Sequence, residues 1–240
     1  MEMKTKQKYL GKSGSIILIA TMNMVVPLSL DMYLPAVPHM TDVFGTTESV
    51  VNLTLVGFFF FLAIGILIFG PLSDKYGRKP LLLIGVIVYL LFSGACALAP
   101  TIELLIVFRV VQALGAGCMV AVSTALIKDC FAGKTRDNVL AVVQAMSVIA
   151  PMVAPLIGAF ILTFSTWRAT FWVLTVIALL CLLATCLLKE TIKREDIYRG
   201  SLAGSVGRLF AVAKNKGFTL FLLVAAGLSA PYMAYIAVCS

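Results

Sequence analysis

Seven long apolar runs constrain the fold of this chain more than any other feature. A helix needs about 20 mostly apolar residues to cross a bilayer, and each run is long enough. Because backbone groups in lipid must satisfy their own hydrogen bonds, each run is expected to be a helix. The runs extend approximately over residues 14–34, 49–70, 80–99, 102–126, 139–163, 169–188 and 217–238. The sequence therefore predicts an all-α polytopic membrane protein.

The composition agrees with this fold class. Of 240 residues, 61% are hydrophobic and 12% are charged, and the mean hydropathy is +1.04. A soluble domain is about half apolar and a quarter charged, and a disordered chain is more polar still, so both classes are excluded. The net charge of +8 does not indicate a nucleic-acid partner, because the basic residues lie in short segments between the apolar runs.

The same basic residues predict the orientation in the membrane. All of the 19 lysines and arginines except Arg109 and Arg168 lie in the N-terminal tail or in segments 71–80, 127–138 and 189–216. Cytoplasmic loops carry such an excess of positive charge. We expect a multi-pass protein of the inner (plasma) membrane with a cytoplasmic N-terminus.

The spacing of the runs predicts two bundles. Residues 1–188 contain six spans, residues 189–216 form a charged, glycine-containing segment, and residues 217–240 contain one more span. The middle segment is expected to be a cytoplasmic linker. One helix alone has no neighbours against which to pack, so we expect it to begin a second, C-terminal bundle that this chain lacks.

The segment between the second and third runs reads Gly-Pro-Leu-Ser-Asp-Lys-Tyr-Gly-Arg-Lys-Pro over 70–80. Gly70 and Gly77 are expected to allow a tight reversal, and Asp74 can accept hydrogen bonds from Arg78 or from backbone N–H groups at a helix start. The segment resembles the G-x-L-[AS]-D-[RK]-x-G-R-[RK] loop of the major facilitator superfamily. That resemblance implies a cytoplasmic gate loop that latches against the second bundle. The alternative is a positively charged inner turn and nothing more.

The fourth run carries Arg109 well inside its apolar stretch. An arginine at the bilayer centre costs about 2.5–3.5 kcal/mol on insertion scales, so we expect it to face the bundle interior with a partner. Gln112 lies one turn further on the same face, and Gly115 and Gly117 allow close helix approach. The pattern resembles the superfamily motif R-x-x-Q-G-x-G, with Ala113 in place of a glycine, and implies proton coupling. A purely structural buried arginine is the alternative.

The fifth run contains Pro151 and Pro155 on one face, followed on that side by Gly158. Prolines at this spacing free backbone carbonyls and bend a helix. The stretch resembles the antiporter signature G-x-x-x-G-P-x-x-G-G with alanine at three glycine positions. The resemblance implies a hinge and an outward direction of transport. An ordinary kinked span is the alternative.

The first run places Asn23, Pro27 and Asp31 at steps of four residues, hence on one helix face. An ionisable residue inside a span is a functional-site hypothesis by default. Asp31 is expected in the outer half of the bilayer at a depth similar to that of Arg109. The two side chains could therefore meet, and the sequence leaves open whether they do. A carboxylate at the membrane interface is the alternative.

Two further segments narrow the resemblance. They are Asp-Met-Tyr-Leu-Pro-Ala-Val-Pro over 31–38 and Trp-Arg-Ala-Thr-Phe-Trp over 167–172. Together with the Ala-Pro repeat of the fifth run, they resemble the bicyclomycin/chloramphenicol-resistance drug efflux family. The resemblance implies proton-driven export of an amphiphilic drug by alternating access. The expected partners are the drug, protons and the bilayer, and the expected coupling residues are Asp31, Arg109, Gln112 and Asn23.

Other classes of function find less support in the sequence. A transport-inactive membrane fragment and a major facilitator transporter of another solute both stay open. An enzyme is not expected, because no HExxH motif, Ser/His arrangement or pair of intramembrane carboxylates occurs. The six cysteines form no CxxC pair and His39 is expected in a surface loop, so neither a disulfide framework nor a metal site is predicted. No cofactor beyond the proton gradient is expected.

Overall fold

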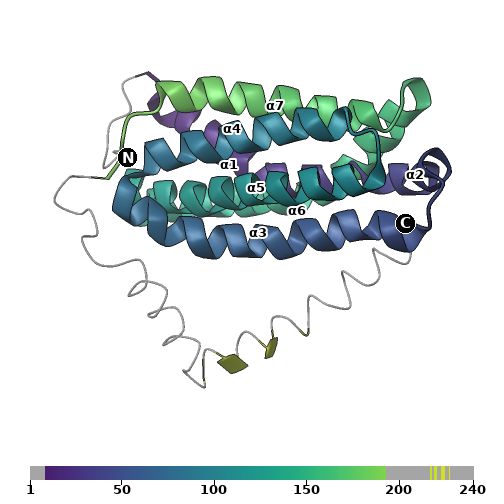
Figure 1. Cartoon of the computed structure of the whole chain (residues 1–240). Helices are drawn as coiled ribbons and strands as arrows, with labels where there is room; N and C mark the ends of the chain where they lie inside the picture. The colour runs from purple at the N-terminus through teal and green to yellow at the C-terminus, as the bar shows by residue number, and fades with distance from the viewer. Residues whose placement is uncertain (1–8, 193–216, 218, 221–222, 225–226, 228–240) are drawn as a thin grey trace. The chain divides into compact units, whose positions relative to one another are not determined.

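The computed structural model describes residues 9–192 and, further along the chain, residues 217, 219, 220, 223, 224 and 227. Between 9 and 192 the chain is helical and contains no strand (Figure 1). Its helices are α1 (Gly11–Asp31), α2 (Val37–Phe44), α3 (Glu48–Tyr76), α4 (Arg78–Ala97), α5 (Ile102–Cys130), α6 (Gly133–Phe164) and α7 (Arg168–Leu187). A short 3-10 turn, η1 (Leu34–Ala36), joins α1 to α2.

Six helical segments in this part are long and apolar enough to cross a membrane, the first of them running from α1 through α2. The first six predicted spans are therefore confirmed. Most of the predicted linker and most of the seventh run, 217–238, lie outside the described residues, so the division into two bundles stays a prediction.

The helices of the bundle pack around α5. This helix contacts α3, α4 and α1, and a second set of contacts joins α4 to α7 and α1 to α6. Of the apolar window of α5, 56% is buried, against 17% for α6. Polar side chains that must avoid lipid are consequently best accommodated on α5, and Arg109 lies there.

Two glycines of α5 allow its close packing, as the sequence predicted. A Cβ atom on Gly117 would lie 2.7 Å from the carbonyl oxygen of Leu62 in α3. One on Gly115 would lie 2.7 Å from the backbone nitrogen of Tyr89 in α4. Neither position has room for a side chain, because backbone on both sides of α5 is already in contact.

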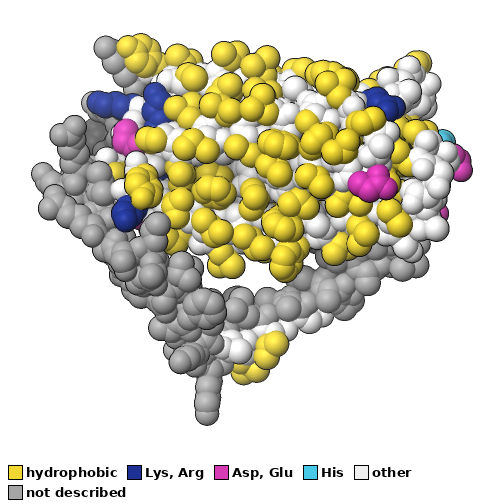
Figure 2. Space-filling view, in the orientation of Figure 1, with side chains coloured by type: hydrophobic (Ala, Val, Ile, Leu, Met, Phe, Trp, Pro, Cys, Tyr) yellow, Lys and Arg dark blue, Asp and Glu magenta, His cyan; other side chains and the backbone are white. Residues whose placement is uncertain are grey.

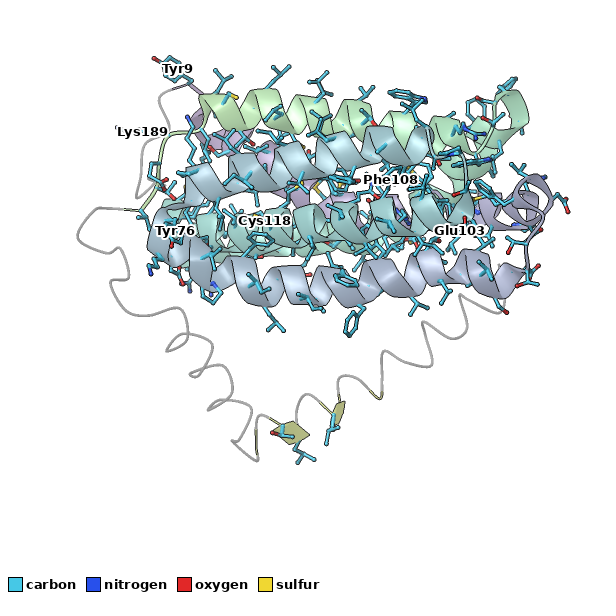
Figure 3. The ribbon with its side chains drawn as sticks, viewed as in Figure 1. Tyr9, Tyr76, Glu103, Phe108, Cys118 and Lys189 are labelled. Atoms are coloured by element: carbon cyan, nitrogen blue, oxygen red, sulfur yellow. The ribbon has the colours of Figure 1, made fainter. Side chains whose placement is uncertain are left out.

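Charged and apolar side chains separate along the bundle. Figure 2 shows hydrophobic side chains over its middle and charged ones towards its two ends. Because successive helices run in opposite directions, the ends of α3, α5 and α7 meet the starts of α4 and α6, and lysines gather there. Figure 3 places Tyr76 and Lys189 at this end and Glu103 at the other. A surface of this kind fits a bilayer around the middle and water at the ends.

Two details of the predicted loops are wrong. Gly70 does not make the reversal between the second and third spans, because α3 continues through Tyr76 and Gly77 alone turns the chain with φ +98°. His39 is exposed as expected, but it lies in α2 and not in a loop. The signals for this extra helical turn were Pro35 and Pro38, since proline favours the first turn of a helix.

Candidate functional site

Arg109 occupies the centre of a buried polar site. Its side chain is 0% exposed. Its Nη1 donates to Oε1 of Gln112 at 3.0 Å, and its Nη2 donates to the backbone carbonyl of Ser29 in α1 at 2.9 Å. Its Nε has no hydrogen-bond partner in the described part of the chain. Gln112 is thus brought to Arg109, as their spacing predicted.

A chain of hydrogen bonds extends this site across three helices. Gln112 donates from Nε2 to Oγ of Ser93 at 2.7 Å, and Ser93 donates to the backbone carbonyl of Tyr89 at 2.7 Å, both on α4. The hydroxyl of Tyr89 lies 2.6 Å from Oγ of Ser29. Since Ser29 Oγ donates to the carbonyl of Val25, Tyr89 is the donor in that pair. Together with the bond from Arg109 to the carbonyl of Ser29, these hydrogen bonds form a closed ring that links α1, α4 and α5.

Sequence reasoning missed Ser29, Ser93 and Tyr89. Each is buried, and none belongs to a motif that the sequence analysis used. A general signal existed, because a hydroxyl group deep inside an apolar span needs an acceptor or donor nearby. That signal identifies candidates but does not say which helix supplies the partner.

Asp31 has different surroundings from Arg109. It is the last residue of α1 and is half-buried, and its carboxylate makes no hydrogen bond or ion pair with the described part of the chain. The backbone keeps helical angles to Tyr33. At about 100° per residue, Asp31 lies about 200° around the axis from Ser29 and from Tyr33, which both contact Arg109 from this part of the chain. The contact between Asp31 and Arg109 that the sequence left open is therefore not formed.

Asn23 lies two turns before Asp31 on the same face of α1. Its amide nitrogen donates to the carbonyl of Ile19 at 2.8 Å and to Oγ of Ser123 in α5 at 3.0 Å. Both amide hydrogens are thereby used, so Asn23 can offer a ligand only its oxygen as an acceptor.

The predicted hinge residues lie on α6, and one of them meets the first span. Pro151 and Pro155 are both inside α6, which stays helical from end to end. Gly158 is buried, and a Cβ atom there would overlap the carbonyl oxygen of Met32. The C-terminal part of α6 therefore touches the chain immediately after Asp31. That α6 acts as a hinge stays a prediction.

The predicted gate loop is an ion-pair cluster centred on Arg78, the first residue of α4. Its Nη1 lies 2.6 Å from Oδ1 of Asp74, and its Nε lies 2.9 Å from Oδ2 of Asp129 at the end of α5. Its Nη1 also donates to Oγ of Ser73. The contact between Asp74 and Arg78 agrees with the sequence, whereas Asp129 was missed. The clue to Asp129 was an acidic residue near a helix C-terminus, which is unfavourable without a cation nearby.

The start of α4 is capped by a residue from beyond α7. The two carboxylate oxygens of Glu190 accept the backbone N–H groups of Arg78 and Lys79, each at 3.0 Å. The sequence had offered Asp74 for such a position. The reason for the difference is geometric, because Asp74 lies inside α3 and its carboxylate is already paired with the side chain of Arg78.

In the described part of the chain, six helical segments able to cross a membrane surround a buried arginine network, which defines the class as a polytopic helical membrane protein. Residues 19–238 match the Major Facilitator Superfamily. The chain belongs to that superfamily.

Two relatives of this chain carry names that refer to drug resistance. The chain is 37% identical over 160 residues to a "Chloramphenicol resistance protein" of Pseudomonas aeruginosa, covering 66% of this chain and 38% of that one. It is 32% identical over 182 residues to a "Bicyclomycin resistance protein homolog" of Haemophilus influenzae, covering 75% and 46%. The resemblance to this family of resistance proteins is thus confirmed. The chain spans less than half the length of either relative.

The fold also matches a solved structure. A crystal structure of the peptide transporter POT in complex with sulfate superposes with a TM-score of 0.66 over 95% of this chain and 49% of that one. At 17% identity this likeness concerns the fold alone.

Proposed function

We propose that this protein exports chloramphenicol- or bicyclomycin-like amphiphilic drugs from the cytoplasm across the inner membrane in exchange for protons. The observation that carries the proposal is Asp31, a half-buried carboxylate at a helix end without a partner in the described part. It lies two residues from Ser29 and from Tyr33, which contact the buried Arg109. The names of the two resistance relatives support the substrate class.

The proposed coupling runs through α1. An unpaired carboxylate can take up a proton or bind the donor group of a drug, and these two events compete. Arg109 binds the carbonyl of Ser29 on the same turn of α1. A change at Asp31 therefore reaches the hydrogen-bonded ring of Arg109 and Gln112 through α1 itself. Asn23, on the same face, adds a neutral acceptor for the drug.

The proposed mechanism is alternating access between two bundles. The cluster around Arg78 joins the inner ends of α3, α4 and α5, and Glu190 adds the segment after α7. The side chain of Asp74 is 53% exposed, which leaves it accessible to a second bundle. We propose that this cluster latches the inner gate and that Pro151, Pro155 and Gly158 allow α6 to bend.

The test is drug efflux by the product of the native gene. The gene is expressed in a bacterial strain without its major drug pumps, and the mass of the inserted product is compared with the 25.8 kDa of this chain. Loaded cells should then lose labelled chloramphenicol or bicyclomycin, and a protonophore should stop the loss. An inserted product that changes the level of neither drug, or that increases it, would contradict the proposal and favour another solute or an inactive fragment.

A further inference from the structure

Arg109 lies inside the bundle, and the described part of the chain places no carboxylate beside it to balance its charge. The ionisable groups that surround its guanidinium in the described part are Tyr33, Tyr89 and Cys96. Phenols and thiols are neutral near pH 7, so none of them supplies an anion. Its two hydrogen bonds go to a neutral amide and a backbone carbonyl. A buried arginine usually pairs with a carboxylate, so something else must stabilise this cation.

Three aromatic rings surround the guanidinium. Its carbon lies 4.6 Å from the ring centroid of Phe58, 4.9 Å from that of Tyr33 and 5.4 Å from that of Phe171. The three rings come from α3, from the residue before η1 and from α7, and all are at most 1% exposed. A cation within about 6 Å of a ring centroid is attracted to the negative face of the ring, and burial strengthens this attraction.

We propose that Phe171, together with Phe58 and Tyr33, is a positioning residue for the proposed transport reaction. The three rings hold Arg109 as a cation in place of a carboxylate. Arg109 then does not require Asp31 as a counter-ion, and the carboxylate, which lies on another side of α1, stays available to a proton or to the drug. This inference rests on the proposed function for its consequence, whereas the contact between Arg109 and the rings is testable without transport.

The start of α7 holds Phe171 in place. Its ring contacts those of Trp167 and Tyr33, with centroids 6.0 and 5.6 Å apart. Trp167 in turn contacts the ring of Phe44 in α2 at 5.4 Å. Arg168 lies over the Trp167 ring at 4.4 Å and donates to the carbonyl of Ala99 at 3.2 Å. The Trp-Arg-x-x-Phe segment thereby acquires a physical role, which is to orient one ring towards Arg109.

The test changes the electron density of the ring and leaves its shape nearly constant. Phenylalanine and its mono-, di- and trifluorinated analogues are inserted at position 171 of the full native gene product by nonsense suppression. Fluorine withdraws electrons from the ring face and weakens its attraction for a cation. The matched control is the same series at Phe92, whose ring contacts Phe108 at 6.0 Å and for which no cation contact is seen in the described part. Both thermal unfolding in detergent and drug efflux are measured.

At Phe171 we expect the midpoint of unfolding to fall with each added fluorine, and efflux to fall by about two- to fivefold between phenylalanine and the trifluorinated ring. At Phe92 neither should follow the number of fluorines. A flat series at Phe171, or an equal trend at Phe92, overturns the inference. If substitution at 171 prevents folding, the series at Phe58 decides in the same way. If the parent exports no drug, the proposed function fails, yet the unfolding series still decides whether the rings hold Arg109.

Discussion

The two charged side chains considered for coupling differ in what holds them. Arg109 is enclosed by hydrogen bonds and aromatic rings, and moving it breaks contacts to three other helices, α1, α3 and α7. Asp31 is half-buried, and its carboxylate has no hydrogen bond or ion pair in the described part. The contrast separates a fixed cation from a carboxylate that is free to change partners, which is what a proton-coupled step requires.

Replacement of Asp31 by asparagine should abolish proton-driven export. The amide has nearly the same shape as the carboxyl group but cannot take up a proton or carry a charge. We expect the variant to insert at the parent level and to retain labelled drug, with efflux at least about tenfold slower, a free-energy change of about 1.4 kcal/mol. The matched control is Asp42→Asn on the exposed side of α2, which should export normally. Efflux by Asp31→Asn at the parent rate would contradict the assignment of Asp31 to proton coupling.

The sequence predicts contacts within one helix better than contacts between helices. Steps of three and four residues correctly put Gln112 beside Arg109, because both lie on one rigid helix. The same reasoning left a contact between Asp31 and Arg109 open and did not foresee Ser29 or Tyr89. Contacts between helices depend on the rotation of each helix about its axis, and periodicity alone does not fix that rotation.

At the scale of elements, the close approach of α6 to the end of α1 depends on a glycine, Gly158. A Cβ atom on Gly158 would overlap the carbonyl of Met32, which cannot move aside without shifting the backbone. Gly158→Val should therefore destabilise the protein by about 1–3 kcal/mol, seen as a fall of several degrees in the unfolding midpoint in detergent. Gly70→Ala is the control, because a Cβ atom there meets nothing within 4 Å and α3 is helical at that point. Equal midpoints for the two variants would contradict the crossing described here.

The cap on α4 gives a second prediction at this scale. Glu190 accepts two backbone N–H groups at the start of that helix, where a negative charge also interacts favourably with the helix dipole. Glu190→Ala leaves both groups without this acceptor and should cost about 1–2 kcal/mol. Asp137→Ala serves as the control, since its side chain is 65% exposed and its ion pair with Arg136 is loose at 3.6 Å. A stability loss no larger at Glu190 than at Asp137 would argue against the cap.

At the scale of the whole molecule, charge predicts the orientation in the membrane. The lysine-rich end, where α3, α5 and α7 finish, should face the cytoplasm. We expect a cysteine at Arg136 to resist a membrane-impermeant thiol reagent in intact cells and to react after permeabilisation. A cysteine at Pro100, which is exposed in the turn between α4 and α5, should react in intact cells. The reverse pattern would place the N-terminus outside. Native cysteines are replaced beforehand, because Cys186 is exposed.

Hydropathy and charge by themselves determined that this chain is a helical membrane protein. A bilayer accepts only backbones that satisfy their own hydrogen bonds. The bilayer also separates apolar residues from charged residues along the membrane normal. The local motifs at Arg109 and at 70–80 identified the superfamily and two of its polar sites. Only the tertiary structure decided which side chains meet across helices. The tertiary structure formed the hydrogen-bonded ring of Ser29, Tyr89, Ser93 and Gln112 and brought Glu190 to the start of α4. It also placed aromatic side chains around Arg109, where the sequence had left a carboxylate possible. These contacts join residues far apart in the chain, and they follow from the packing and rotation of helices, which no single helix specifies.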